Sequence, residues 1–315
     1  MGFELQSFLT SVVPVGFDLN QKMSTPSLIC AGLNLLITIA VPVVFILYLR
    51  KRATLELKSL LVGGLVYILM NKIILNAIGV GLSMIPGIQQ YMVSNSAGMQ
   101  VISVVLAFLM EFLAIFLGLM WIRRKQLTFN DCMMFIFGYT CIVVLTETVA
   151  QSLAMFINCV AINVQGLESI FAQIAEADMD MAVSAYRSVL EANPLEFLVE
   201  GMNCIIQFLI RVCSCILIYA SFSGKTGKQN IVIALFSLLL YYIPIGIYAS
   251  QIMQSRVVVE VMFLVVVVVV TFYTYTVLKK ELAQDWKDFN TGKGKKNKPN
   301  KKQPQKMPKI VMPKD

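Results

Sequence analysis

Long apolar stretches constrain the fold of this chain of 315 residues more than any other feature. A helix needs roughly 20 mostly apolar residues to cross about 30 Å of hydrocarbon. We predict seven such spans, at residues 27–49, 59–83, 99–122, 132–160, 196–221, 230–252 and 257–278. Hydrophobic residues make up 57% of the chain and charged residues 14%, which excludes an ordinary soluble domain. The expected fold class is therefore all-α, a polytopic membrane helix bundle of seven transmembrane helices.

Basic residues between the predicted spans indicate the orientation of the chain. Short loops rich in Lys and Arg stay on the cytoplasmic side of a membrane. Such clusters follow the first, third, fifth and seventh spans, beginning at Arg50, Arg123, Lys225 and Lys279, whereas the other connections carry few basic residues. We expect a multi-pass protein of the cell membrane, with its N-terminus outside and its C-terminus in the cytoplasm.

The predicted seven-helix membrane domain covers residues 27–280 and contains one sizeable outer loop, at residues 161–195. In that loop Leu167, Ile170, Phe171 and Ile174 repeat at helical spacing opposite acidic residues. This pattern predicts an amphipathic helix lying at the outer surface. Its acidic face is interpreted as solvated, with a site for a cationic ligand as the alternative. Residues 1–26 are predicted to form an interfacial N-terminal segment.

Residues 281–315 are predicted to be a basic, disordered cytoplasmic tail, because Lys, Asn, Pro, Gln and Gly dominate its sequence and cannot bury a core. Lysines beside a last membrane helix favour binding to anionic membrane lipids. We expect no nucleic-acid partner, because no aromatic residue follows Phe289.

The sequence contains no histidine, and this absence excludes whole classes of function. The absence excludes catalytic serine and cysteine triads of the usual kind, and it excludes haem ligation by histidine. The seven cysteines lie in or at the edges of predicted spans and form no Cys-x-x-Cys pair, so we interpret them as packing residues. No metal site and no cofactor are predicted.

Polar residues follow one stripe on each of two predicted spans. The stripes comprise Glu200, Asn203, Gln207, Arg211 and Ser214 on the fifth span, and Thr140, Glu147, Gln151 and Asn158 on the fourth. Their spacings of three, four and seven residues place each set on one helical face. Lipid does not solvate such faces, so the two stripes must face each other or water.

Three ionisable residues, Glu111, Glu147 and Arg211, fall at similar depth near the middle of their spans. Because charge at this depth is costly, we hypothesise a buried cluster with a functional role. Its two carboxylates share one local arginine, so either a second cation enters or one acid keeps its proton. The second span adds Asn71 and Lys72, and the seventh adds Glu260. For single residues such as Asn71 or Glu260 we favour a role in holding helices together, at roughly 0.6 kcal/mol per contact.

Several short motifs occur in a characteristic order along the membrane domain. They are Leu47 to Arg52, Leu60 to Gly64, the glutamate of the third span, Gly138 to Glu147, Glu200, Glu260 and Leu278 to Glu281. In this order and spacing the chain resembles the YhfC-type membrane proteins, which are grouped with glutamate-dependent intramembrane peptidases. The resemblance covers nearly the whole membrane portion.

The resemblance implies further motif residues that this chain lacks. It implies two adjacent glutamates and an arginine one turn later, but Phe112 follows Glu111, and Ala114 or Ile115 stands at the arginine position. It also implies a Gly-His-Gly element one turn before the glutamate of the fourth span, and Val143 stands there.

Further histidines of the family pattern would fall around Gln207 to Arg211 and at Tyr241 or Tyr242. In the peptidases that the resemblance implies, glutamate and histidine jointly activate a water molecule, directly or through a metal. We therefore predict a degenerate, catalytically inactive member.

This member is expected to bind a peptide or a transmembrane segment of another membrane protein in a polar intramembrane cavity. The candidate binding residues are Arg211, Glu200, Asn203, Gln207, Gln151, Asn158, Tyr241 and Tyr242. One alternative is an active histidine-free peptidase in which Glu111 and Glu147 are catalytic. The other is a transport-related membrane subunit.

Overall fold

The computed structural model describes residues 18–53, 56–88, 96–123, 127–174, 178–224, 226–249 and 256–291. Within these ranges every regular element is a helix. Seven helices are long and apolar enough to cross a membrane: Thr25–Arg52, Leu57–Ser83, Gly98–Ile122, Phe129–Gln165, Pro194–Phe222, Gln229–Ile247 and Val258–Lys280. The prediction of an all-α bundle of seven spans is confirmed. The orientation of the termini stays a prediction.

Two of the spans are composite. The second consists of α3 (Leu57–Tyr67), the π-helix η1 (Ile68–Ile74) and α4 (Leu75–Ser83). The fourth consists of α7 (Phe129–Val143), the π-helix η2 (Val144–Val149) and α8 (Ala150–Gln165). The remaining spans are α2 (Thr25–Arg52), α6 (Ser96–Arg123), α11 (Pro194–Phe222), α12 (Gln229–Ala249) and α13 (Arg256–Lys280).

Side chains at the helix starts account for several of these boundaries. Thr128 and Asp131 form a reciprocal capping box at the start of α7, so two backbone N–H groups without an intrahelical partner are satisfied. Asn193 caps α11 by accepting from the backbone N–H of Leu195, and Pro194 occupies the first turn. Both caps precede strongly apolar sequence, so each fixes where a membrane helix begins.

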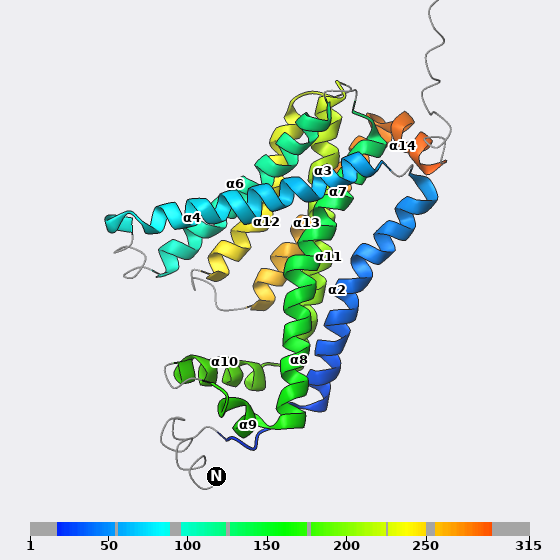
Figure 1. Ribbon diagram of the computed structural model, residues 1–315. Coiled ribbons are helices and arrows are strands. Elements are labelled where there is room, and N and C mark those ends of the chain that lie inside the picture. The colour runs from blue at the N-terminus through cyan, green and yellow to red at the C-terminus, as the bar shows by residue number, and fades with distance from the viewer. Residues whose placement is uncertain are drawn as a thin grey trace, which may run out of the picture.

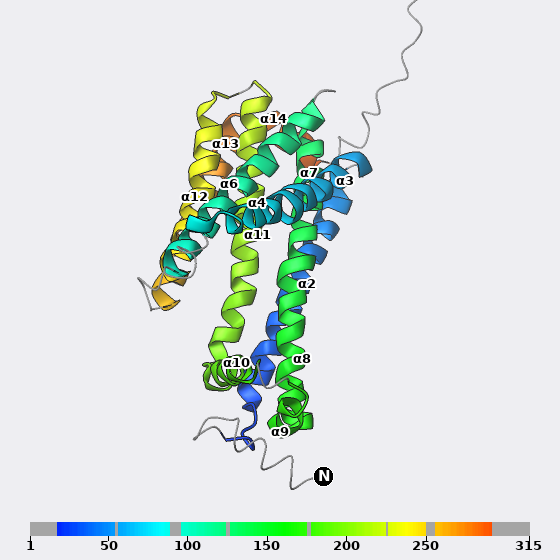
Figure 2. The same ribbon diagram turned by 60° about the vertical axis from the view of Figure 1, so that its left-hand side comes forward.

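Helix α11 is the centre of the bundle and contacts α2, α7, α12 and α13. Helix α2 packs against both α8 and α11, while α6 and α12 diverge from α8 toward their lower ends (Figure 1). Both views show α3, η1 and α4 crossing the bundle at a steep angle to α8 (Figures 1 and 2). This arrangement places the middle of the second span against the middle of the fourth.

Two glycines bring α3 against α7 at very short range. A Cβ atom on Gly63 would lie 2.1 Å from the backbone oxygen of Phe135, and one on Gly138 would lie 2.0 Å from that of Leu60. Small residues permit this backbone approach between membrane helices. The α3 to α7 contact anchors the span that carries Lys72.

The loop that was predicted to be outer forms two short helices instead of one. Helix α8 continues to Gln165, α9 covers Leu167–Phe171 and α10 covers Met179–Glu191. Gly166 separates α8 from α9 with a φ of 79°, a conformation that glycine adopts without steric cost. The apolar side chains of both pieces meet in one cluster with the lower ends of α2 and α8, at the end of the bundle opposite α14 (Figure 1).

The predicted disordered tail begins with an ordered helix, α14 (Ala283–Asn290). For these residues the prediction of disorder is wrong. Phe289 is buried, and its ring centroid lies 5.3 Å from that of Phe129 on α7, which Trp286 also contacts edge to face. Trp286 and Phe289, one turn apart, give α14 an apolar face that packs on the bundle. The average composition of the segment does not reveal this face, because charged and polar residues surround the two aromatic ones. Residues 292–315 and 1–17, parts of the predicted tail and N-terminal segment, lie outside the described residues.

Candidate intramembrane binding site

A buried ion pair joins α6 to α11 near mid-span. The Nε of Arg211 lies 2.6 Å from Oε1 of Glu111, and its Nη2 lies 3.1 Å from Oε2. The two side chains are only 8% and 4% exposed. Tyr242 of α12 donates its hydroxyl to the same carboxylate at 2.5 Å, and Arg211 also donates to Gln207 at 3.1 Å. Glu111 thus accepts a bidentate pair of hydrogen bonds from a guanidinium and one hydrogen bond from a phenol. Charge-assisted, bidentate bonds of this kind are among the strongest that a carboxylate forms.

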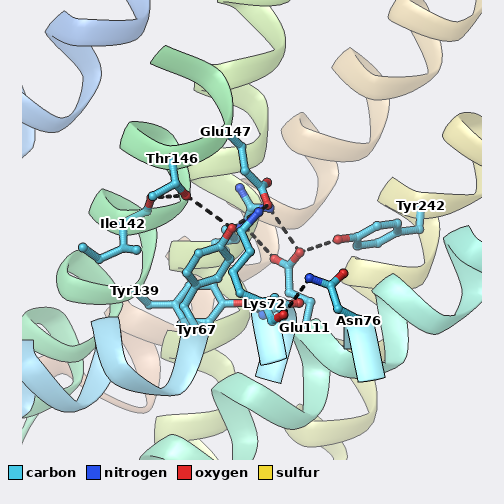
Figure 3. A network of polar contacts seen from close by, with 11 residues as sticks. Tyr67, Lys72, Asn76, Glu111, Tyr139, Ile142, Thr146, Glu147 and Tyr242 are labelled. Carbon is cyan, nitrogen blue, oxygen red and sulfur yellow. Dashed lines mark hydrogen bonds and ion pairs between the residues drawn. The ribbon is translucent and has the colours of Figure 1, made fainter. Parts of the chain in front are cut away.

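A second ion pair joins the second span to the fourth. The Nζ of Lys72 lies 2.9 Å from Oε1 of Glu147, and Tyr67 donates its hydroxyl to the same oxygen at 2.5 Å. Here the side chains are 43% and 46% exposed, so the pair lies at the surface of the bundle although both residues sit near mid-span. Figure 3 shows Lys72 reaching toward Glu147, with Tyr67 beneath.

Both residues of this second pair lie in π-helical segments, Lys72 in η1 and Glu147 in η2. A π-helix leaves backbone carbonyls without their usual partner, and such segments occur often at functional sites. Polar side chains take up carbonyls here: Asn76 donates to the carbonyl of Lys72 at 2.7 Å, and Thr146 donates to that of Ile142 at 2.8 Å (Figure 3). The irregular backbone places the two charges against each other.

The predicted cluster of Glu111, Glu147 and Arg211 is resolved into two neighbouring pairs. Arg211 binds Glu111, and Lys72 pairs with Glu147 as a second cation, the first of the two possibilities that the charge count left open. Arg211 also acts electrostatically on Glu147, so the two pairs share one polar region. Lys72 was not among the residues predicted to form the cluster. Its position in the middle of an apolar span was the signal of a charged partner, but spacing within one helix does not reveal that partner.

A polar cavity of about 290 Å³ adjoins the second pair. It is lined by Glu147, Thr148, Gln151, Ser152, Asn203, Cys204 and Gln207. The middle parts of the two polar stripes therefore face each other along this cavity, which lies between η2 with α8 on one side and α11 on the other. Asn203 donates to Glu260 of α13 at 3.1 Å, which links the cavity wall to the seventh span.

The remaining candidate residues lie elsewhere. Asn158 is exposed on α8 and does not line the cavity. Tyr241 is buried in the apolar core, with its ring 5.2 Å from that of Phe263. Glu200 belongs to α11, but its side chain lies outside the described residues. The site residues that the sequence did not single out are Tyr67 and Lys72 beside Glu147, and Thr148, Ser152 and Cys204 in the cavity wall.

A family model described as YhfC intramembrane metalloprotease matches residues 37–269. The chain belongs to the YhfC family. This match, together with seven apolar spans, makes it an integral membrane protein related to intramembrane proteases. Comparisons with curated proteins and with solved structures find no match.

The family description implies a metal, and the residues of this YhfC member do not fit one. The described part of the chain contains no group of three His, Cys, Asp or Glu residues able to hold a metal ion. Its two mid-span carboxylates are each engaged by a cation and a phenol, and two carboxylates are too few for a hard-ion cage. At positions where the resemblance implies histidines, Arg211 and Tyr242 donate to Glu111 instead.

Proposed function

We propose that this YhfC family member binds a peptide or a transmembrane segment of another membrane protein in the cavity between η2, α8 and α11, without hydrolysing it. One observation carries the proposal. The Lys72 and Glu147 side chains lie near mid-span, yet 43% and 46% of their surface is uncovered by the protein. Lipid tails do not solvate such charges, so water or a bound polar segment must cover them.

The chemistry of Glu111 supports binding without hydrolysis. A general base needs a carboxylate oxygen within reach of the water that it activates. Both oxygens of Glu111 already accept hydrogen bonds, from Arg211 and from Tyr242, and the side chain is 4% exposed. The chain has no histidine to take over the base role.

The lining of the cavity supports a peptide as the bound group. Apart from Glu147 and Cys204, it consists of the hydroxyls of Thr148 and Ser152 and of three side-chain amides. These groups pair with peptide N–H and C=O groups, which need partners wherever a helix at membrane depth is irregular. A polar stretch of a partner's transmembrane segment is therefore the matching ligand.

Hydrolysis by Glu147 is the second candidate function, and the exposure of the Glu147 side chain favours this function. Glu147 is the sole ionisable acid among the described cavity residues, and nearly half of its side chain is accessible. Activation of a water molecule by this group would require release of Lys72 and Tyr67.

One experiment separates the two functions. Membrane peptide profiles are compared between cells expressing wild type and cells expressing the Glu111→Gln/Glu147→Gln double variant. In the same cells a photo-crosslinking residue replaces Gln151, which lines the cavity, or Leu153, which is exposed on α8 outside it.

We expect identical peptide profiles and crosslinks to a membrane protein from position 151 but not from 153. Specific cleavage products that the double variant loses would replace the proposal with peptidase activity. Absence of crosslinks from position 151 would refute binding in this cavity.

A further inference from the structure

We infer that the cavity selects an alkylammonium group, namely the side chain of a lysine within the bound segment. In the unbound protein, Lys72 occupies the position on Glu147 that this ligand lysine would take. This inference rests on the proposed function and names the ligand chemistry of the same site. It is carried by the composition of the cavity wall, by an unpaired acceptor and by the geometry of the Lys72 to Glu147 pair (Figure 3).

The cavity wall carries a negative charge and no positive one. Glu147 is its single ionised residue among the seven described lining residues, which include no Lys or Arg. Arg211 stands behind the wall, where its guanidinium is committed to Glu111 and to the side-chain oxygen of Gln207. Once Lys72 is displaced, a carboxylate in a wall without another charge favours a cationic ligand over an anionic one, because opposite charges stabilise each other.

One residue of the wall, Asn203, also holds a buried acceptor without a donor within the described residues. Asn203 uses its amide nitrogen to bind Glu260, and its buried Oδ1 has no hydrogen-bond partner within the described residues. The amide of Gln207, by contrast, is engaged by Arg211 and interacts with the hydroxyl of Tyr241. An ammonium group has three donors and no acceptor, so it suits Glu147 and Asn203 together better than a hydroxyl or an amide does.

Lys72 is suited to be replaced, and Arg211 is not. Lys72 makes a single-point contact with one oxygen of Glu147, from a flexible stem on a π-helical segment, with 43% of its side chain exposed. Arg211 donates to both oxygens of Glu111 from its planar guanidinium, and its side chain is only 8% exposed. An incoming lysine forms the same contact with Glu147 that Lys72 gives up, so Glu147 stays paired. The displaced Lys72 ammonium remains on the chain and must be solvated from its exposed side.

The test uses the full-length protein in lipid nanodiscs and fluorescent Leu- and Ala-rich helical peptides of about 23 residues. The peptides carry Lys, norleucine or Glu at the central position. The protein is wild type, Lys72→Met, Glu147→Gln or the control Lys58→Met, which removes an exposed lysine from the same helical span away from the site. n-Butylammonium, which carries the same charged group without a peptide, is titrated separately.

We expect the Lys peptide to bind wild type roughly tenfold more tightly than the norleucine peptide, the difference that about 1.4 kcal/mol produces. Lys72→Met should tighten binding of the Lys peptide further, Glu147→Gln should abolish the preference, and Lys58→Met should change neither. Lys72→Met keeps Glu147, so it decides the matter even where Glu147→Gln does not fold.

The contrary outcomes are distinguishable. Equal binding of the three peptides would overturn the ligand class while leaving peptide binding intact. Binding of n-butylammonium through Glu147 without binding of any peptide would assign the cavity to a small amine and overturn the lysine peptide as ligand. Failure of every peptide, together with absence of crosslinks from position 151, would remove the proposed function and this inference with it.

Discussion

Glu111 and Glu147 show how burial gives two glutamates of similar depth different roles. Glu111 is 4% exposed and bound through both oxygens, so its charge is neutralised within the core. Glu147 is 46% exposed beside a polar cavity, with one lysine against one oxygen. Glu111 is therefore suited to holding α6 against α11, and Glu147 is suited to binding a ligand.

The buried pair predicts a non-additive mutational effect. Arg211→Met leaves the Glu111 charge uncompensated in the core and should cost roughly 3–5 kcal/mol of unfolding free energy. Adding Glu111→Gln removes that charge, so the double variant should be more stable than Arg211→Met alone. Denaturant unfolding of purified protein in detergent measures both changes.

The exposed pair provides the control for this measurement. Because Lys72 and Glu147 are 43% and 46% exposed, Lys72→Met should cost no more than about 1 kcal/mol. Strictly additive effects of Arg211→Met and Glu111→Gln would contradict the buried pair described above.

At the scale of elements, the position of the second span depends on its glycines. Gly63 and Gly138 place backbone against backbone, with no room for a methyl group on either side. The contact fixes α3 on α7, and η1 then carries Lys72 to η2. Helix packing therefore sets the geometry of the ion pair.

Alanine substitutions test this contact. Gly63→Ala and Gly138→Ala force the helices apart and should each lower the unfolding free energy by about 1–3 kcal/mol, with more if the backbones cannot separate. The matched control is Gly79→Ala on the same span, where a Cβ would meet no atom within 4 Å, and its stability should stay equal or rise slightly. Thermal unfolding in detergent reports all three, and equal melting temperatures would refute the close approach.

At the scale of the whole molecule, the seven candidate spans of the described residues are an odd number, which predicts that the two ends of the membrane domain lie on opposite sides. The basic residues predict which end is cytoplasmic, because the clusters after the first, third, fifth and seventh spans all fall on one side. The same side would carry α14 and the lysine-rich residues that follow it.

Reporter fusions in bacterial cells test this orientation. Alkaline phosphatase, which folds only outside the cytoplasm, should be active when fused after Gly87 and inactive when fused after Gln126. Green fluorescent protein at the C-terminus should fluoresce, because it folds in the cytoplasm. The opposite pattern for these fusions would reverse the orientation and place the lysine-rich tail outside.

The sequence alone determined the fold class, the number of spans and the mid-span charges worth attention. These follow from local properties, because the cost of placing a residue in hydrocarbon depends on that residue, and helical spacing shows which neighbours share its face. The stripes on the fourth and fifth spans were predictable for this reason, and part of each, Glu147 with Gln151 and Asn203 with Gln207, lines one cavity.

Only the tertiary structure decided which charges pair, where the helices become π-helical and that α14 packs on the bundle. Arg211 lies 100 residues from Glu111, and Lys72 lies 75 residues from Glu147. Whether such side chains meet depends on the rotation, tilt and depth of separate helices. Those quantities follow from the glycine contact of α3 with α7 and from the packing around α11, because side chains from distant segments fix them together.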